Sequence, residues 1–220
     1  MTKLSLSPDE YDLINNTGWI ITKHRVMKKV YDFFGELLPT FVEEVSRCAT
    51  LFPENIKYQN GKISRGENYQ LLPYAILDYP AFFWKENILA IRTMFWWGNF
   101  FSVTLHLSGD HKKKFINGRD DILPWLQSHG YSICCNTTEW EHHFREDNYK
   151  TTEGMDVEEY LKINDKNFFK ISRPVPLTQW DNAETILLTS FRELLQLLKF
   201  SFQAGEKGLL PVSPTTGSGL

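Results

Sequence analysis

The chain has 220 residues, of which 42% are hydrophobic and 23% are charged, a balance that is ordinary for a globular protein with one sizeable core. Its formal net charge of −3 argues against nucleic-acid binding, because proteins that bind nucleic acids usually carry a basic field to meet the phosphates. No run is apolar enough for a signal peptide or a membrane span. The three cysteines, Cys48, Cys134 and Cys135, form no disulfide framework. These features predict a cytoplasmic protein without a membrane partner.

Two helices are predicted at the start of the chain. Ser7 and Glu10 have the spacing of a capping box, which predicts a short first helix. Residues 19–52 repeat apolar side chains at steps of three and four, which predicts a longer second helix. We expect Gly35 and Pro39 to kink this helix or to split it in two.

The middle of the chain predicts strands. Leu71–Leu77 has the composition of a strand, and Pro73 suggests that it lies at a sheet edge or begins there. The aromatic segment Ile88–Leu107 predicts two strands that are joined by a two-residue turn at Gly98 and Asn99.

The expected turn divides this hairpin into two faces. A two-residue turn places Trp97 opposite Phe100, and paired residues share a face. One face is then apolar apart from Arg92, and we expect it to lie under the helices. The other face is mixed, and it carries Trp97, Thr104 and His106.

A guanidinium group on the apolar face needs a partner, because a buried charge without one is very costly. Asp78, at the end of the preceding strand, is the first choice, and Glu67 and Glu86 are alternatives. A second possibility is that Arg92 lies at the floor of a pocket and binds a carboxylate or phosphate ligand through bidentate contacts.

The remaining elements are less regular until the end of the chain. Prolines 174 and 176 indicate that the last expected strand is an edge, and Gly205 is expected to end the terminal helix. We expect loops over residues 53–70, 108–121 and 137–155, helices over 122–128, 156–163 and 181–203, and strands over 131–136 and 168–176.

Helices, then strands, then a terminal helix predict an α+β fold. We expect a single domain over residues 1–205, in which an antiparallel β-sheet of about four to six strands, with the central hairpin 88–107, is packed by the N-terminal helices and a long C-terminal helix. Residues 206–220 have low complexity and are expected to be disordered.

Four hairpin residues are candidate ligand-binding residues: Arg92, His106, Thr104 and Trp97. Polar groups beside aromatic side chains are typical of small-molecule sites. A catalytic role for His106 lacks support at this level, because spacing identifies neither a nucleophile nor an orienting acid.

One further segment, Glu139–His143, has residue types that bind metals. It does not match H-E-x-x-H, and no third ligand follows at a defined spacing, so we expect no metal and no cofactor. Cys134 and Cys135 lie on an expected strand without neighbouring cations, which predicts inert thiols.

The leading hypothesis is a non-catalytic domain that binds a partner protein or a small anionic ligand, with a homodimer to which the terminal helix contributes as one form of it. The alternative is a hydrolase or transferase, with or without a metal, whose site lies near His106 and Arg92 or at Glu139–His143. The alternative requires titratable groups that converge in one pocket.

Overall fold

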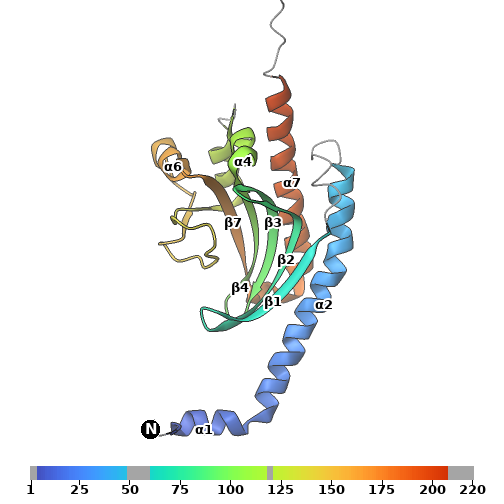
Figure 1. The fold of residues 1–220 in the computed structure, drawn as a ribbon, viewed down its shortest axis with the longest axis vertical. Coiled ribbons are helices and arrows are strands. Elements are labelled where there is room, and N and C mark those ends of the chain that lie inside the picture. Colours follow the sequence, from blue (N-terminus) through green and yellow to red (C-terminus); the bar gives the residue numbers. More distant parts are fainter. Residues whose placement is uncertain (1–3, 49–59, 118–120, 208–220) are drawn as a thin grey trace, which may run out of the picture.

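A seven-stranded antiparallel sheet organises the described part of this computed structural model, which covers residues 4–48, 60–117 and 121–207 (Figure 1). The order of the strands in the sheet is β1-β2-β3-β4-β7-β5-β6. The α+β prediction is confirmed, with seven strands where about four to six were expected. The strands are β1 (Lys62–Tyr69), β2 (Leu72–Trp84), β3 (Asn87–Trp96), β4 (Phe100–Ser108), β5 (Ser132–Cys134), β6 (Tyr149–Thr151) and β7 (Phe168–Pro176).

Two long helices pack on one face of the sheet, as predicted, and the short first helix extends away from it (Figure 1). None of the helices in the described ranges combines the length and the apolar composition that crossing a membrane requires. The helices are α1 (Pro8–Asn15), α2 (Thr17–Arg47), α4 (Gly109–Ile116), α5 (Ile122–His129), α6 (Val157–Asn164) and α7 (Ala183–Lys207), with a 3-10 helix η1 (Leu177–Asn182) before α7.

The N-terminal helices form largely as the sequence predicts. Ser7 and Glu10 make the capping box of α1. Of the two outcomes expected at Gly35 and Pro39, the split does not occur, because α2 runs through both as one helix of 31 residues. Its apolar stripe packs on the sheet on both sides of Pro39, and this packing offsets the lost backbone hydrogen bond. The expected end of the helix, near residue 52, falls outside the described residues.

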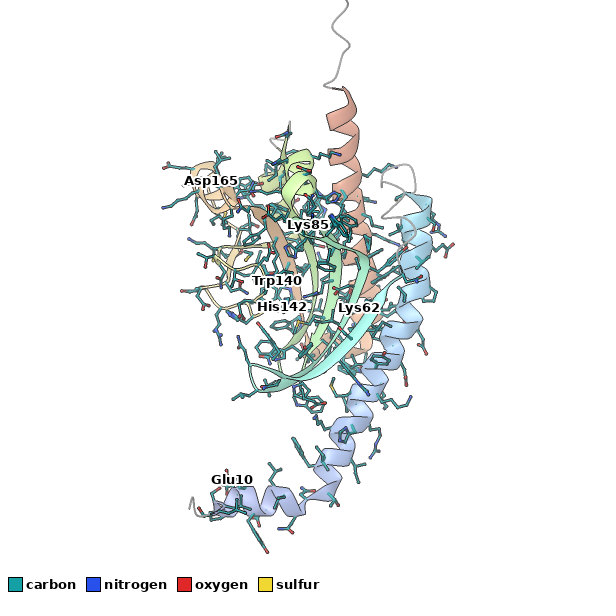
Figure 2. The ribbon with its side chains drawn as sticks, in the orientation of Figure 1. Glu10, Lys62, Lys85, Trp140, His142 and Asp165 are labelled. Carbon is teal, nitrogen blue, oxygen red and sulfur yellow. The ribbon has the colours of Figure 1, made fainter. Side chains whose placement is uncertain are left out.

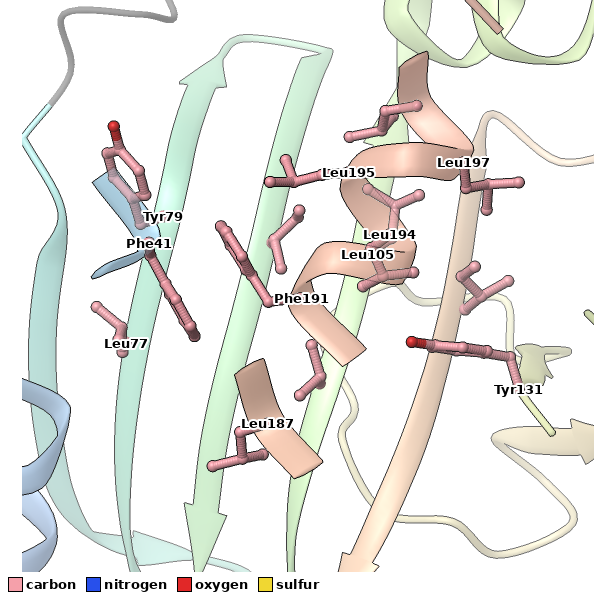
Figure 3. Packing of buried hydrophobic residues seen from close by; sticks show 14 of the residues in the cluster. Phe41, Leu77, Tyr79, Leu105, Tyr131, Leu187, Phe191, Leu194, Leu195 and Leu197 are labelled. Carbon is pink, nitrogen blue, oxygen red and sulfur yellow. The ribbon is translucent and has the colours of Figure 1, made fainter. Parts of the chain in front are cut away.

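The core lies between these helices and the sheet (Figure 3). The rings of Phe41, on α2, and Phe191, on α7, stack with their centroids 3.8 Å apart and their planes 2° from parallel. Leu187 and Leu194 extend the buried stripe of α7 onto the strands, as their helical spacing predicts.

The first strand was missed, because residues 53–70 were expected to form a loop. β1 is a polar, largely exposed strand at one edge of the sheet, so it lacks the apolar alternation of a half-buried strand. Its presence places β2 between β1 and β3, so of the two explanations for Pro73 the edge position was wrong, and the start of the strand is confirmed by its beginning at Leu72. β2 also continues past Pro80 through a register shift between Asp78 and Ala81.

The turn of the hairpin is longer than expected, and this extra residue changes which face of the sheet the β3 side chains occupy. Trp96 pairs with Phe100, so three residues, 97–99, form the connection. Gly98 adopts a φ of +72°, and the amide of Asn99 donates to the carbonyl of Trp96 at 3.1 Å. Gly98 therefore occupies the turn position that requires a positive φ, which glycine adopts without strain. An odd connection shifts one strand by one residue, so the β4 side chains keep their predicted faces, whereas every β3 side chain lies on the face opposite to the prediction.

The C-terminal half contains two further differences. Residues 109–116, expected in a loop, form α4, in which Phe115 is the buried side chain. β7 has the predicted bounds but lies between β4 and β5, so the expected edge position was wrong. β5 pairs only with residues 171 and 172, which leaves the proline end of β7 paired on one side alone.

The terminal helix is longer than predicted. α7 continues through Gly205 to Lys207, so glycine did not end it. The tail expected over residues 206–220 therefore begins inside the helix, and residues 208–220 lie outside the described part of the chain.

Candidate functional site

Three of the four candidate residues meet on the face of the sheet opposite α2 and α7. Arg92 pairs with Thr104, and Ala90 pairs with His106, so Arg92, Thr104 and His106 share one face. The expectation that Arg92 lies under the helices, apart from His106, was wrong because of the three-residue turn. The helix-covered face instead carries the buried side chains Leu89, Ile91, Phe95, Phe101, Val103, Leu105 and Leu107.

Trp97 lies away from this group. It is a half-buried residue of the hairpin turn that packs against the main core, with its ring 6.4 Å from that of Phe95 in an edge contact. The structure therefore does not bring Trp97 together with the other three candidates.

Arg92 has the partner that the sequence predicts. Its Nε donates to Oδ1 of Asp78 at 2.7 Å, and its Nη2 donates to Oδ2 at 2.9 Å, which makes a bidentate pair. Its third nitrogen, Nη1, lies 3.1 Å from Nε2 of His142. Burial and the nearby Lys170 and Arg92 charges lower the pKa of His142 well below its ordinary value, so its neutral ring can accept this bond.

A buried lysine holds the segment that covers this face. Residues 135–148, here called the covering loop, run over the open side of β3, β4 and β7. Lys170, only 2% exposed, donates from Nζ to the carbonyls of Glu139 at 2.8 Å and Glu141 at 2.5 Å. Burial lowers the pKa of Lys170 to about 8. Lys170 therefore fixes the backbone of the covering loop.

Tyr69 attaches the same loop to the end of β1. Its hydroxyl donates to Oε2 of Glu141 at 2.9 Å and accepts the amides of His142 at 2.7 Å and His143 at 3.1 Å. Burial is the main cause that raises the pKa of Tyr69 to about 12, so the hydroxyl keeps its proton and can donate.

His106 lies against a carboxylate of the covering loop. Its Nε2 is 3.2 Å from Oε2 of Glu139, although the direction of this approach does not satisfy hydrogen-bond geometry. The rings of Trp140 and Phe168 make edge contacts with the imidazole at 5.6 and 6.2 Å. Burial lowers the pKa of His106, and Glu139 opposes this shift. The imidazole of His106 is therefore neutral, and Glu139, Trp140 and Phe168 enclose it.

The nearby hydroxyl and thiol groups lack the features of nucleophiles. Thr104 Oγ1 and Ser172 Oγ lie 2.7 Å apart and hydrogen-bond each other, and both residues are buried. Burial raises the pKa of the Cys134 thiol, which disfavours the thiolate. This region gives no activated nucleophile beside His106.

The residues at Glu139–His143 have different partners. Glu139 faces His106, Glu141 binds Tyr69, and His142 faces Arg92. The segment lies in the covering loop and not on a helix. Across the described ranges, no three His, Cys, Asp or Glu side chains form a group that could hold a metal ion.

A cleft of about 1190 Å³ opens beside His106, between α4, α6 and the start of the covering loop. Glu139, Trp140 and Phe168 line it, so the same residues that enclose His106 form one wall. Figure 2 shows Lys85 and Asp165, at the upper end of the sheet, and Trp140 on the covering loop. The charged lining residues are Lys85, Lys112, Lys113, Lys162 and Lys166, against Glu86, Glu139 and Asp165.

Four of these lysines have no carboxylate at ion-pair distance among the described residues: Lys85, Lys112, Lys162 and Lys166. Lys112 Nζ donates to the carbonyl of Asn164 at 2.6 Å and to that of Lys166. Lys166 Nζ donates to the carbonyls of Cys134 at 2.5 Å and Asn136 at 3.1 Å. Desolvation is the main cause that lowers the pKa of both lysines, and the nearby Asp165 carboxylate opposes this shift at Lys112.

The sequence reasoning missed Lys170 and the lysine cleft. A lysine between apolar residues in the strand FFKIS was a signal for Lys170, because a charge there is unusual. The cleft lysines come from residues 85, 112–113 and 162–166, and only the tertiary fold brings these segments together.

Comparisons with protein families, with curated proteins and with solved structures found no match to this chain. The covered face of the sheet and the cleft beside it are therefore the features from which a function can be inferred.

Proposed function

We propose that the cleft binds a small organic anion, and that the protein acts by binding rather than by catalysis. The observation that carries this proposal is the group of four lysines without carboxylate partners around one cavity. Cations that face a shared cavity repel one another, and an anionic ligand relieves this repulsion. The basic lining stands out in a chain whose net charge is −3.

Trp140 supports a ligand with an apolar or aromatic part. Its side chain lines the cleft, and the residue is 52% exposed. An exposed indole beside ammonium groups offers a flat apolar surface next to positive charge. A carboxylate or phosphate joined to a ring matches both features, and a cleft of this volume admits a ligand of that size.

The candidate residues identified from the sequence have a supporting role in this proposal. Arg92 and Lys170 hold the covering loop, and His106 supports Trp140 and Glu139 from behind. Thr104 lies deeper and bonds Ser172. They therefore shape one wall of the cleft, while the lysines contact the ligand.

A hydrolase or transferase centred on His106 is the alternative. The approach of Glu139 to within 3.2 Å of His106 favours it, because a carboxylate can orient an imidazole. The burial of His106 and the mutual hydrogen bond of Thr104 and Ser172 favour the binding proposal instead. Free cysteines at positions 48, 134 and 135 agree with a reducing compartment.

Calorimetric titration with phenyl phosphate tests the proposal, with benzyl alcohol as an uncharged ring of similar size. We expect phenyl phosphate to bind and benzyl alcohol not to bind. The double variant Lys85→Gln/Lys162→Gln should weaken binding by about 10-fold or more, because two charged contacts are lost. Both lysines have no described ion pair, so their replacement should preserve the fold.

Lys62 and Lys199 provide the matched control, since both are exposed and neither lines the cleft. Lys62→Gln/Lys199→Gln makes the same change in net charge and should leave the affinity unchanged. Equal weakening by the two double variants would show a general charge effect and would contradict the assigned cleft.

A further inference from the structure

The N-terminal end of the chain extends from the body as an arm (Figure 1). The arm consists of residues 4–26, which are α1 and the first turns of α2. α1 has no buried residue, and the helix that it mainly contacts is α2. Its apolar side chains are nevertheless large, as Ile14 is 70% exposed and Tyr11 is 62% exposed.

The apolar stripe of α2 continues into this arm. Met27, Val30 and Phe34 are buried against the sheet at steps of three and four. The same stripe extends back to Ile20, and Trp19 and Ile21 flank it, but all three are exposed because the body ends before them. An apolar helix face without a partner in its own chain is a docking surface.

The N-terminal part of the arm and the segment 23–29, which runs from its end into the body, carry opposite charges. Residues 4–22 contain three acids, Asp9, Glu10 and Asp12, and no Lys or Arg. Residues 23–29 contain Lys23, Arg25, Lys28 and Lys29 and no acid. Lys23 pairs with Glu67, Lys28 pairs with Asp32 at 2.6 Å, and Glu10 caps α1.

Two acids and two cations therefore remain available. Asp9 and Asp12 are three residues apart on α1, and Arg25 and Lys29 are four apart on α2, so each pair lies on one helix face. Among the described residues, no ion pair joins α1 to α2 of the same chain.

We propose that the arm docks on a second copy of this chain, with α1 of each protomer against the start of α2 of its partner. The contact is isologous, so the acidic face of α1 meets the basic face of the partner twice in one dimer. Leu13 lies four residues after Asp9 and Ile21 lies four residues before Arg25, so these two exposed apolar residues share the charged faces and become buried in the contact.

This surface fits a second copy better than the other possible occupants. An anionic lipid surface attracts helices whose polar face is basic, and α1 carries only acids. α7 was the expected dimer surface, but its apolar side chains between Ile186 and Leu198 are buried or half-buried.

Sedimentation equilibrium of two charge-reversed variants tests the exchange. Asp9→Lys/Asp12→Lys makes both rows basic, and Arg25→Glu/Lys29→Glu makes both rows acidic. We expect the wild type to dimerise and each variant alone to dimerise at least ~10-fold more weakly, because like charges then face each other. An equimolar mixture of the two variants should form heterodimers, since every contact then joins opposite charges.

Glu153→Lys/Glu184→Lys is the matched control, because both acids are exposed and lie outside the arm. It should dimerise like the wild type. A wild type that stays monomeric up to its solubility limit would overturn the proposal, and so would variants that do not associate when mixed. Monomers that bind vesicles of anionic lipid would assign the arm to membranes instead and would equally overturn it.

Discussion

Arg92 and Asp78 lie opposite each other on neighbouring strands and form two parallel hydrogen bonds, of 2.7 and 2.9 Å. Asp78 is only 4% exposed, so its carboxylate depends on this guanidinium for its charge partner. The same guanidinium reaches His142 of the covering loop. One ion pair therefore joins the sheet to the loop that forms the wall of the cleft.

Removing the arginine should destabilise the protein strongly. Arg92→Met leaves the buried Asp78 carboxylate without a cation, and we expect a loss of about 3–5 kcal/mol in the free energy of unfolding. Asp78→Asn in the same background removes the uncompensated charge and should recover part of this loss. Urea unfolding of the wild type, both single variants and the double variant measures these differences. A double variant that is no more stable than Arg92→Met would contradict the pairing.

Glu139 should control the titration of His106. Burial lowers the pKa of this imidazole, and Glu139 raises it in opposition. Glu139→Gln removes the carboxylate charge, so the pKa of His106 should fall further. Proton NMR titration of the imidazole in the wild type and the variant measures the shift. An unchanged or higher pKa would show that the 3.2 Å approach has no electrostatic effect.

Lys170 should make the free energy of unfolding rise with pH in the alkaline range. Its pKa falls from 10.5 to about 8 on folding, so the unfolded chain binds more protons between these values. The wild type should therefore gain stability relative to Lys170→Met as the pH rises from 8 towards 10, by up to about 1.4 kcal/mol per pH unit. Urea unfolding across this range measures the difference. Parallel curves for the two proteins would contradict the depressed pKa.

The stacked rings of Phe41 and Phe191 should be a main link between α2 and α7. Phe191→Ala removes a fully buried ring, and we expect it to destabilise the protein by about 3–5 kcal/mol. Thermal and urea unfolding measure this loss. Leu161→Ala is the control at an exposed position and should change stability little. Similar effects from both variants would contradict the packing between the helices.

Local signals predicted several elements correctly. The spacing of Ser7 and Glu10 predicted the capping box of α1, and the strand expected over residues 168–176 has the bounds of β7. The need of a buried guanidinium for a carboxylate predicted the pairing of Arg92 with Asp78. Each of these inferences depends on residues that are close in sequence or on a strong energetic requirement.

The predictions failed where contacts between distant segments decide the local structure. The turn at Gly98 is one residue longer than expected, and this single residue places Arg92 on the face of His106 instead of under the helices. β1 and α4 were missed because KISRGENY and GDHKKKFI contain few apolar side chains and obtain their order from neighbours. The cleft combines segments about 80 residues apart, and no local sequence pattern predicts that these segments lie side by side.

The most direct test of the proposed function is a two-dimensional ¹H–¹⁵N NMR titration of the whole chain with phenyl phosphate. The account predicts that the indole signal of Trp140 and the backbone signals of residues 85–86, 109–113 and 162–168 shift together with one Kd, while signals of α2 stay fixed. Shifts spread over exposed lysines elsewhere, or no shift at these residues, would contradict an anion site in the cleft.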